Sequence, residues 1–492
     1  MIHNNQMKIR KHADIKLVIT MALKKEMPKD WFLSHGVPVH TLYALKSGDL
    51  VQSSRPDVGI LAVITGAGPD SSTEAACWIR DNLSPLFVFN IGTCGVSDKR
   101  HTLGDWFSPG YAVNEEGGML ELDARLPVPY PDNLIRVNSL LSVKETVKGN
   151  SPTQWRHHDI VDMECYSQAS VFSKANIAFH CLKFGSDYSD SNTFRDFNRN
   201  LASFRAAVKK LFEFIERNGK HKNITAIVPV YNREYTIKRA VDSILSQSHV
   251  PDEIIVVDDC STDRTRDILE SYGNEIRGIY LSKNSGPSRA RNEGIIHART
   301  EWLAFLDSDD CWEKDKMKRQ IEYLKQYPFY QILQSEEKWI RNDIRVNPHK
   351  HHEKPEGWIF EPSLERCLLS PSSVLARKSL LETFGCFEES LPVCEDYDLW
   401  LKISRHHPVG LDHASTVIKY GGHKDQLSRK YPAMDRFRVE SLVRLLKQEP
   451  VPYFREKIVK VLKKKLTILL QGYEKRQKLQ EAQKCKDMLE SL

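Results

Sequence analysis

Short apolar runs separated by helical patterns recur along this 492-residue chain and predict a succession of buried strands. A first series of strand-like runs covers residues 15–20, 58–64, 86–91 and 178–184, and a helical pattern at 201–216 closes it. A second series covers residues 224–230, 253–257, 278–281 and 302–306. Because strands that alternate with helices pair mostly in parallel, each half of the chain is predicted to be an α/β domain with a mostly parallel sheet.

A polar stretch without periodicity separates the two series at residues 217–223, and we place a linker there. The predicted organisation is a first domain at 1–216, a second domain at 224–432 and a helical tail at 433–492. The tail is predicted to be helical because apolar residues recur among many lysines, at Leu462, Leu466, Ile468, Leu469 and Tyr473. A chain of 492 residues is also too long for one compact core.

The positive charge of the chain is concentrated in this tail. The whole chain has a net charge of +6, whereas residues 435–492 alone contain 15 Lys/Arg and 8 Asp/Glu, a balance of +7. The rest of the chain is therefore nearly neutral, which disfavours a body that binds nucleic acid. A basic helical tail has three interpretations: a solvated face, a surface for an anionic membrane, or helices that pack on the catalytic domain or a partner chain.

Cysteine usage and hydropathy indicate a reducing compartment. The ten cysteines are scattered without a Cys-x-x-Cys pair, so neither a zinc site nor a disulfide framework is indicated. No window approaches the length of a membrane-spanning helix, and the polar beginning of the chain lacks the apolar core of a signal peptide. We therefore expect a cytoplasmic protein.

Three carboxylates follow the apolar run at 302–306, namely Asp307, Asp309 and Asp310. Ligands of open α/β sheets bind at the carboxyl ends of the strands, and carboxylates crowded there repel one another unless they share a cation. A divalent metal that carries a diphosphate is the natural candidate. The alternative is that Asp310 opens a capping box with Glu313 at the start of the next helix.

Other strand ends in the second half carry residues suited to a nucleotide. Pro229 and Tyr231 end the first strand, Asp259 follows the second, and Lys283 and Arg289 flank a Gly-Pro turn that leads into a helix. A carboxylate can accept from a base or ribose, and cations at a helix start suit phosphate. Each motif alone also fits a turn, a cap or a solvated helix start.

Taken together in type, order and spacing, these motifs resemble the family 2 glycosyltransferases of the GT-A fold over residues 223 to about 430. The resemblance implies that Asp259 contacts the nucleotide base. It also implies that Asp307, Asp309 and Asp310 hold a nucleotide-sugar and Mg²⁺ or Mn²⁺, with Asp309 and Asp310 as the preferred metal ligands.

Two segments downstream complete this resemblance. Cys394-Glu-Asp-Tyr-Asp-Leu-Trp400 resembles the family's Glu-Asp motif, which makes Asp396 the general base toward the acceptor hydroxyl. Such a transfer with inversion needs one carboxylate to deprotonate the acceptor while the metal stabilises the leaving diphosphate. The same acids also suit the start of a helix. His423 lies in a segment resembling the one whose histidine approaches the metal or diphosphate, although a lone histidine is usually structural.

Glycine-bearing strand ends mark a second candidate pocket in the first half. The segments 63–68 and 90–95, with 160–165 and 184–190, resemble the nucleoside phosphorylase and methylthioadenosine/S-adenosylhomocysteine nucleosidase superfamily over residues 15–216. The resemblance implies that Met163 and Glu164 bind the ribose. It further implies that Asp187, beside Ser186, protonates the purine and that Glu26 activates the attacking water.

Several departures from this superfamily keep alternatives open. The stretch between Gly104 and Val161 differs in detail, and basic residues are sparse at the strand ends, which disfavours a phosphate-using phosphorylase over a hydrolase. The acids could instead be ordinary caps or surface acids, or the domain could be a non-catalytic nucleoside-binding module.

The leading prediction is a metal-dependent inverting glycosyltransferase fused to a nucleosidase-like domain, and thus a bifunctional enzyme. The expected ligands are a UDP-sugar, a purine nucleoside and a saccharide or lipid-linked acceptor, with Trp358 and residues 371–373 lining the acceptor side. The alternatives are a purine nucleosidase as the main activity and a sensor without turnover. A dimer through the first domain and a peripheral membrane contact are further expectations.

Overall fold

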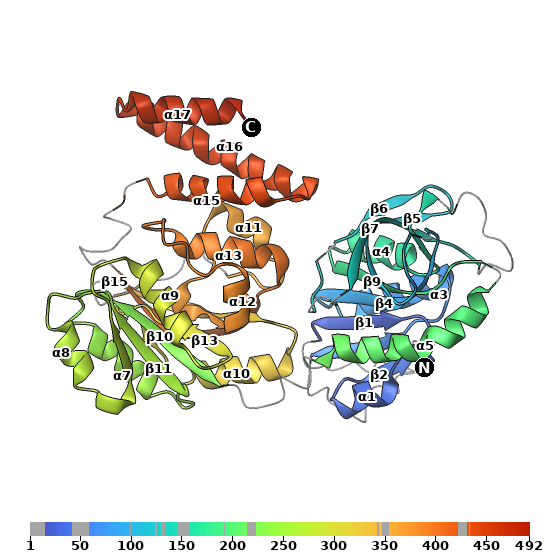
Figure 1. The fold of residues 1–492 in the computed structure, drawn as a ribbon, viewed down its shortest axis with the longest axis horizontal. Coiled ribbons are helices and arrows are strands. Elements are labelled where there is room, and N and C mark those ends of the chain that lie inside the picture. Colours follow the sequence, from blue (N-terminus) through green and yellow to red (C-terminus); the bar gives the residue numbers. More distant parts are fainter. Residues whose placement is uncertain are drawn as a thin grey trace, which may run out of the picture. The chain divides into compact units, whose positions relative to one another are not determined.

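The computed structural model describes residues 15–41, 59–98, 100–123, 125–128, 131, 133–145, 155, 157–190, 192–213, 223–341, 344–346, 354–421, 431 and 433–492. The chain divides into two compact units, residues 1–220 with 324–329 and residues 221–323 with 330–492 (Figure 1). The predicted α/β class with a helical C-terminal tail is confirmed. None of the helices in the described ranges has the length and apolar content that a transmembrane span requires.

A nine-stranded sheet forms the centre of the first unit. Its strands are β1 (Leu17–Met21), β2 (Val39–Thr41), β3 (Ile60–Ile64), β4 (Phe87–Val96), β5 (Trp106–Asn114), β6 (Met119–Glu121), β7 (Leu134–Ser142), β8 (Ile160–Asp162) and β9 (Ala178–Asp187). They follow the order β2-β3-β1-β4-β8-β7-β5-β6, and β9 pairs with β4 and β5. Strands β4, β8, β7, β5 and β9 therefore close into a ring, whose pairs are both parallel and antiparallel.

Continuous apolar runs explain the middle of this sheet. Every residue of β1 and β3 is buried, and β1 pairs in parallel with both β3 and β4. Strands buried on both faces lack the polar alternation of a half-exposed sheet, as the sequence runs predicted. The helices of this unit are α1 (Lys29–Ser34), α3 (Pro69–Asn82), α4 (Cys165–Lys174) and α5 (Thr193–Leu211).

The second unit contains another nine-stranded sheet, in the order β12-β11-β10-β13-β17-β15-β18-β14 with β16 beside β15. Its strands are β10 (Ile224–Val230), β11 (Glu253–Asp258), β12 (Arg277–Tyr280), β13 (Trp302–Phe305), β14 (Cys311–Trp312), β15 (Ile332–Arg341), β16 (Ile344–Val346), β17 (Leu375–Arg377) and β18 (Gly410–Gly421). Strands β12, β11, β10 and β13 are parallel neighbours. Their carboxyl ends therefore meet at one edge, where the sequence places its nucleotide motifs.

The remainder of this sheet differs from the prediction of a mostly parallel arrangement. Strand β17 pairs antiparallel with β13 and β15, and β14 pairs antiparallel with β18. A parallel pair needs a long crossover, usually a helix, between its strands. The segment from β14 to β18 has lost the regular strand–helix alternation, so its strands join the sheet in both directions.

Helices surround this sheet and continue into the tail. They are α7 (Ile237–Leu245), α8 (Thr265–Glu270), α9 (Pro287–His297), α10 (Lys316–Gln326), α11 (Phe360–Glu365), α12 (Lys378–Thr383), α13 (Glu395–His406), α15 (Asp435–Gln448), α16 (Pro452–Lys475) and α17 (Leu479–Glu490). In Figure 1 the last three helices follow one another outward from α11 and α13.

The tail shares a hydrophobic core with the second unit. Phe360 of α11 and Tyr397 of α13 belong to the same buried cluster as Leu442, Ile458 and other tail residues. Of the three interpretations of the basic tail, the fold therefore supports the one in which its helices pack on the second domain. The apolar side of the helices faces that domain, and most of the lysines lie on the exposed side.

A buried ion pair also fastens the tail to α13. The Arg405 guanidinium donates to both carboxylate oxygens of Glu449, at 2.6 and 2.8 Å, and both side chains are nearly inaccessible to water. A bidentate pair fixes relative orientation as well as distance. Helices α13 and α15 are therefore held in register at this end.

Candidate functional site

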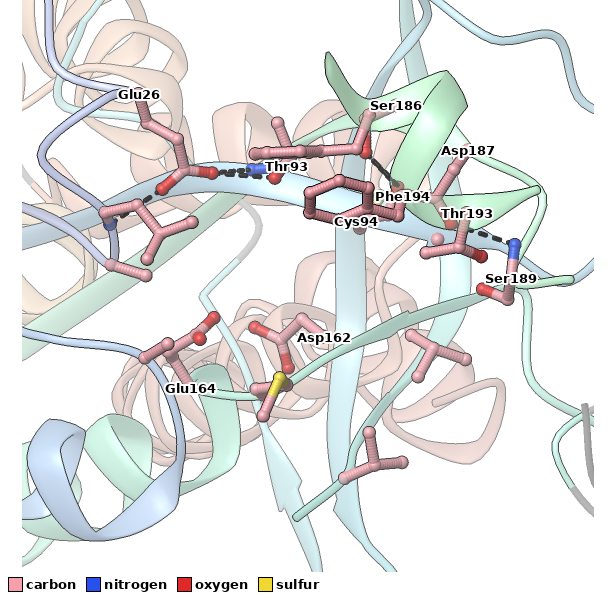
Figure 2. Close-up of a pocket in the computed structure, with 18 of the residues that line it drawn as sticks. Glu26, Thr93, Cys94, Asp162, Glu164, Ser186, Asp187, Ser189, Thr193 and Phe194 are labelled. Carbon is pink, nitrogen blue, oxygen red and sulfur yellow. Dashed lines mark hydrogen bonds between the residues drawn. The ribbon is translucent and has the colours of Figure 1, made fainter. Parts of the chain in front are cut away.

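A cavity of about 390 Å³ lies in the first unit where β4, β8 and β9 end. It is lined by all five residues that the sequence assigned to nucleoside chemistry, namely Glu26, Met163, Glu164, Ser186 and Asp187. Figure 2 shows Glu26 and Asp187 at opposite ends of this pocket, with Glu164 beneath the space between them. Residues from distant parts of the sequence thus converge on one cavity.

Glu26 is held rigidly although it lies in an irregular segment between β1 and α1. One carboxylate oxygen accepts from the Leu23 amide at 2.9 Å, and the other accepts from the amide and hydroxyl of Thr93 at 3.1 and 2.7 Å. Its side chain is buried, so these donors replace water around the charge. An oriented, desolvated carboxylate of this kind can accept a proton from a water molecule in the cavity.

Glu164 lies beside a buried ion pair that the sequence analysis did not identify. Lys183, in the middle of β9, contacts Asp162 at 2.8 Å and Glu164 at 3.9 Å. Burial raises the pKa of Glu164 to about 7, with the Lys183 charge opposing and the Asp162 charge adding to this rise. The sequence pattern that could have indicated this ion pair is a single lysine, Lys183, inside an apolar strand. A buried lysine is costly unless it has an acidic partner.

Asp187 ends β9 and is held in a turn. Its carboxylate accepts from the Ser186 hydroxyl at 2.7 Å and from the Ser189 amide at 2.9 Å. Burial raises the pKa of Asp187, although these hydrogen bonds act in the opposite direction. A carboxyl group whose pKa is raised can carry a proton nearer to neutral pH and donate it to a leaving base.

Aromatic side chains complete the cavity wall and were not predicted. Phe194 and Phe197 of α5 and Trp155 also line it, and Figure 2 shows Phe194 beside Ser186 and Asp187. The Lys25 ammonium lies 4.4 Å from the centre of the Phe197 ring. Flat apolar groups of this kind suit a heterocyclic base.

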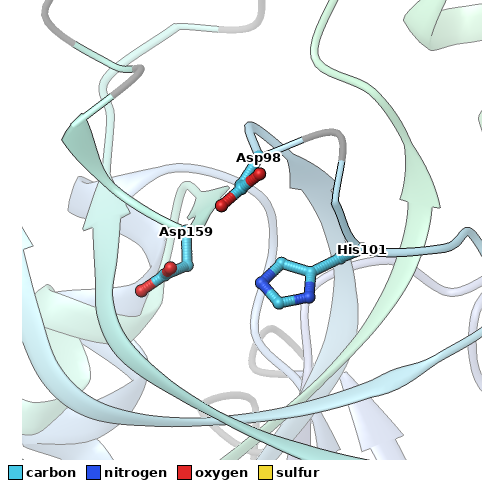
Figure 3. Close-up of side chains that lie close together, drawn as sticks. All are labelled: Asp98, His101 and Asp159. Carbon is cyan, nitrogen blue, oxygen red and sulfur yellow. The ribbon is translucent and has the colours of Figure 1, made fainter.

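A separate group of potential metal ligands lies away from this cavity. Asp98, His101 and Asp159 bring one ligand atom each within 4.8 Å of one another (Figure 3). The Asp98 carboxylate already accepts from Arg100 at 2.7 Å, which lowers its pKa to about 2, and Asp159 accepts from the amides of Asn138 and Ser139. These carboxylates are already engaged by the protein.

In the second unit, the predicted nucleotide residues lie along the edge where the parallel strands end. Asp259 follows β11, is almost fully buried, and accepts from the amides of Ser285 and Gly286, each at 2.7 Å. Burial raises the pKa of Asp259, and the two amides oppose the rise. Asp259 therefore fixes the loop that starts α9, where Gly286 has a φ of 91° that favours glycine.

The acidic strand end is built around two cations. Arg291 of α9 donates to Asp307 at 2.8 Å, and Lys419 of β18 lies 3.9 Å from Asp307 and 3.4 Å from Asp310. Although burial acts to raise it, the Arg291 and Lys419 charges lower the pKa of Asp307. Arg289 of the same helix, predicted to bind the donor, pairs with Glu293 and Glu389.

Asp310 is the most deeply buried of the three aspartates. Its carboxylate accepts from the Ser372 hydroxyl at 2.7 Å and from the Tyr420 amide at 3.2 Å. Burial raises the pKa of Asp310 to about 7. The 3₁₀ turn at Pro371–Ser373, predicted to line the acceptor side, therefore also supports the acidic strand end.

The oxygen-rich strand end suits a hard divalent cation. Burial, together with the neighbouring Asp307 charge, raises the pKa of Asp309, and no cation of the described residues lies within ion-pair distance of it. A cation would relieve this repulsion, with diphosphate oxygens supplying further ligands. Among the described residues, Asp307, Asp309 and Asp310 do not bring one carboxylate oxygen each within 4.8 Å of one another, so these three side chains alone do not preform a three-ligand site.

The remaining predicted residues occupy different environments. Pro229 is buried within β10, Tyr231 just beyond it has 42% of its side chain exposed, and Lys283 is exposed on the loop after β12. Asp396 is the second residue of α13 and is half-buried, next to the buried Glu395. His423 lies outside the described residues.

Comparison with protein families identifies the second unit. Residues 225–380 match the model of glycosyl transferase family 2. A glycosyltransferase of Rickettsia typhi (strain ATCC VR-144 / Wilmington), itself uncharacterised, is 32% identical over 220 residues, which cover 43% of this chain and 68% of that protein. TuaG of Bacillus subtilis (strain 168), named for teichuronic acid biosynthesis, is 47% identical over 104 residues, which cover 20% of this chain and 41% of TuaG.

The match covers 41% of the length of TuaG. It covers 36% and 35% of the lengths of two further uncharacterised glycosyltransferases, from Rickettsia conorii (strain ATCC VR-613 / Malish 7) and Rickettsia felis (strain ATCC VR-1525 / URRWXCal2). Among solved structures, S. aureus TarS 1–349 in complex with UDP-GlcNAc matches with a TM-score of 0.42 and 24% identity, over 50% of this chain and 71% of TarS. The 5'-methylthioadenosine/S-adenosyl homocysteine nucleosidase of Helicobacter pylori matches with a TM-score of 0.32 and 14% identity, over 42% of this chain and 99% of that protein. Similarity of fold does not by itself identify a function.

The family model, over residues 225–380, and the Rickettsia typhi relative both match this chain to glycosyltransferases, whereas most of the predicted linker lies outside the described residues. These matches confirm the sequence prediction for the C-terminal half, whereas the roles of individual residues stay predictions. The chain belongs to glycosyl transferase family 2.

Proposed function

We propose that the second unit transfers a sugar, with inversion, from a UDP-sugar to an acceptor hydroxyl with the help of Mg²⁺ or Mn²⁺. The observation that carries this proposal is the shared edge of β12, β11, β10 and β13, where Asp259 and the acidic strand end gather. Asp396 belongs to the same neighbourhood, because Arg291 contacts both Asp307 and Glu395.

The proposed reaction is one displacement at the anomeric carbon of the sugar. The acceptor oxygen forms the new bond, the nucleoside diphosphate leaves with the electron pair of the old bond, and Asp396 takes the acceptor proton. A bound divalent cation would stabilise the charge of the departing diphosphate. The residues that would hold it are Asp309 and Asp310, with Asp307 kept in place by Arg291.

Turnover of a panel of UDP-sugars with Mg²⁺ or Mn²⁺ tests this proposal, with saccharide and lipid-linked acceptors supplied. Asp396→Asn should abolish transfer while UDP-sugar binding stays within about twofold of the wild-type value, because the base does not hold the donor. Glu270→Gln, an exposed change on α8, is the control and should transfer normally. Transfer by Asp396→Asn at the wild-type rate would contradict its role as the base.

The first unit has a second candidate function, N-glycosidic hydrolysis of a purine nucleoside. The observation that favours it is the cavity with Glu26 at one end and Asp187 at the other. In this proposal Asp187 protonates the departing purine, Glu26 accepts a proton from the attacking water, and Glu164 binds the ribose hydroxyls. Aromatic walls from α5 provide a surface for the base.

Release of adenine from methylthioadenosine tests this second function. Asp187→Asn should lower the release at least 100-fold, since general acid catalysis contributes about 10²–10⁴-fold. Asp98→Asn, in the separate acidic cluster, is the control and should leave the release unchanged. Tight nucleoside binding without adenine release would favour a non-catalytic sensor.

We place both activities in the cytoplasm, in support of which all ten cysteines are free.

Exposed lysines of α16, such as Lys460 and Lys463, support an additional contact with anionic lipid headgroups. Sedimentation with phosphatidylserine vesicles should show binding that decreases with salt. Failure to bind at any salt concentration would remove the membrane contact from the proposal. A dimer through the first unit would be detected by light scattering.

A further inference from the structure

We propose that Arg291 is a positioning residue that couples the donor side of the glycosyltransferase site to the helix that carries the acceptor base. The inference rests on the proposed function of the second unit and adds a role for a residue outside the predicted site. Arg291 lies in α9, between the acidic strand end after β13 and the first residue of α13. One guanidinium bridges the two.

Arg291 donates hydrogen bonds to two carboxylates that belong to different segments. One terminal nitrogen donates to Asp307 at 2.8 Å and the other donates to Glu395 at 2.6 Å. The Arg291 side chain is only 7% exposed, and its guanidinium also lies 5.2 Å from the centre of the Phe387 ring. A planar fork held in this way fixes direction as well as distance, which a lysine ammonium cannot do toward two partners.

The start of α13 depends on this contact more than an ordinary helix start does. Cys394, the residue before the helix, has a φ of 64° and makes no capping hydrogen bond with its side chain. The first turn carries three acids, Glu395, Asp396 and Asp398, which suit the positive end of the helix dipole but repel one another. Arg291 neutralises the first of them, and Asp396 follows immediately on the same turn.

The two carboxylates held by Arg291 are not equivalent. Asp307 has a second cation nearby, since Lys419 lies 3.9 Å away, whereas among the described residues Arg291 is the cation paired with Glu395. A cation held by Asp309 and Asp310 would also attract the adjacent Asp307 carboxylate and would therefore change the charge balance on Arg291, which Glu395 contacts directly. Donor binding should in this way tighten the turn that holds Asp396.

Hydrogen exchange of residues 394–401 in the full chain tests the coupling, with UDP and Mn²⁺ as the probe. In the wild type, UDP with Mn²⁺ should slow exchange of this segment at least tenfold. In Arg291→Lys the slowing should fall below twofold. The matched control is Arg405→Lys, which weakens another buried arginine pair at the opposite end of the same helix and should keep the tenfold slowing.

A kinetic measurement separates positioning from a purely structural role. Glu395→Gln weakens the contact of Arg291 with α13 and leaves its contact with Asp307 in place. The kcat for transfer should therefore fall at least tenfold, while KM for the UDP-sugar changes less than threefold. Arg291→Lys should lower kcat and raise the donor KM, and the double variant should lose less than the product of the two single effects. An equal UDP-induced slowing in Arg291→Lys and wild type, or a normal kcat in Glu395→Gln, would overturn the inference.

Failure of the proposed function can be distinguished from failure of this inference. If the wild type neither binds UDP nor transfers any sugar, the proposed function is wrong. In that case, the hydrogen-exchange rate of residues 394–401 without ligand tests whether Arg291 positions the start of α13. Arg291→Lys should exchange there at least tenfold faster than Arg405→Lys, and equal rates would overturn the inference.

Discussion

Replacing Glu164 by glutamine should stabilise the first unit at alkaline pH and weaken the nucleoside binding proposed for it at the same time. Glu164 is 7% exposed, and burial raises its pKa from 4.5 to about 7. A glutamine has nearly the same shape and carries no charge at any pH. The change therefore removes the cost of a buried carboxylate, and it replaces one of the two carboxylate oxygens proposed to bind ribose hydroxyls by an amide group that donates.

The sign and size of the effect follow from proton linkage. The folded state holds the Glu164 proton up to about pH 7, whereas the unfolded state releases it near pH 4.5, so folding takes up a proton between these values. The free energy of unfolding of the wild type therefore falls as pH rises through this window and is level above it. About 2.5 pH units at about 1.36 kcal/mol each give a loss of about 3 kcal/mol.

The assay is thermal unfolding of the full chain at pH 5 and pH 8. At pH 8 the transition of the first unit should occur about 6–12 °C higher in Glu164→Gln than in the wild type, taking about 2–4 °C per kcal/mol. At pH 5 the difference should be small, because both side chains are then mostly neutral. Lys183 keeps its Asp162 partner at 2.8 Å in the variant. Equal differences in Tm at the two pH values would refute the reasoning.

Three other predictions address the tail, the acidic strand end and the nucleoside cavity. Glu449→Ala should lower the free energy of unfolding of the second unit by about 3–5 kcal/mol in urea titration, because it leaves the buried Arg405 unpaired. Mn²⁺ affinity in the presence of UDP, measured by calorimetry, should rise about tenfold from pH 6 to pH 8, because Asp310, with a pKa of about 7, must lose its proton to bind a cation. Gly95→Ala should weaken nucleoside binding at least tenfold in equilibrium dialysis, because the new Cβ would lie 1.8 Å from the Ser189 hydroxyl oxygen.

The first two of these predictions have a control variant, and the third has an outcome that would contradict it. Glu440→Ala breaks an exposed pair with Arg444 on α15 and should cost less than about 1 kcal/mol. An equal loss in both tail variants would contradict the buried-pair argument. Asp310→Asn should bind Mn²⁺ with little change between pH 6 and pH 8, and a persistent tenfold rise would assign the titration to another group. Normal nucleoside binding by Gly95→Ala would mean that the Ser189 turn is not needed.

The apolar runs were sufficient to predict β1, β3, β4 and β9 of the first sheet and β10 to β13 of the second, but the other strands of both sheets were not predicted. The strand-end rule then placed the acidic residues of the second unit at one edge, since it depends on strand direction rather than on contacts. The prediction of a mostly parallel second sheet was wrong beyond β13, where the alternation that supports the rule is lost. No local pattern specifies the direction of short strands such as β14 and β17.

The buried cations were harder to predict because their partners are distant in sequence. Lys183 interrupts the buried strand β9, where such a residue is tolerated only with a partner, whereas Lys419 lies in the mixed polar and apolar strand β18. The choice of Arg289 over Arg291 could not be made from composition, since both belong to one basic helix start. Residues two apart point to nearly opposite sides of a helix, so only the orientation of α9 decides between them.

The distance along the chain between Asp310 and the Tyr420 amide that supports it sets an order for biosynthesis. The two residues are 110 positions apart, and β18 also supplies Lys419. At about 5–20 residues per second, a ribosome needs about 5–20 s to add that length after Asp310. During this interval the acidic strand end of the nascent chain lacks one of its two cations. All nine strands of the first unit, by contrast, have been synthesised once Asp187 is added. The nucleoside cavity can therefore mature on the ribosome well before the glycosyltransferase becomes competent.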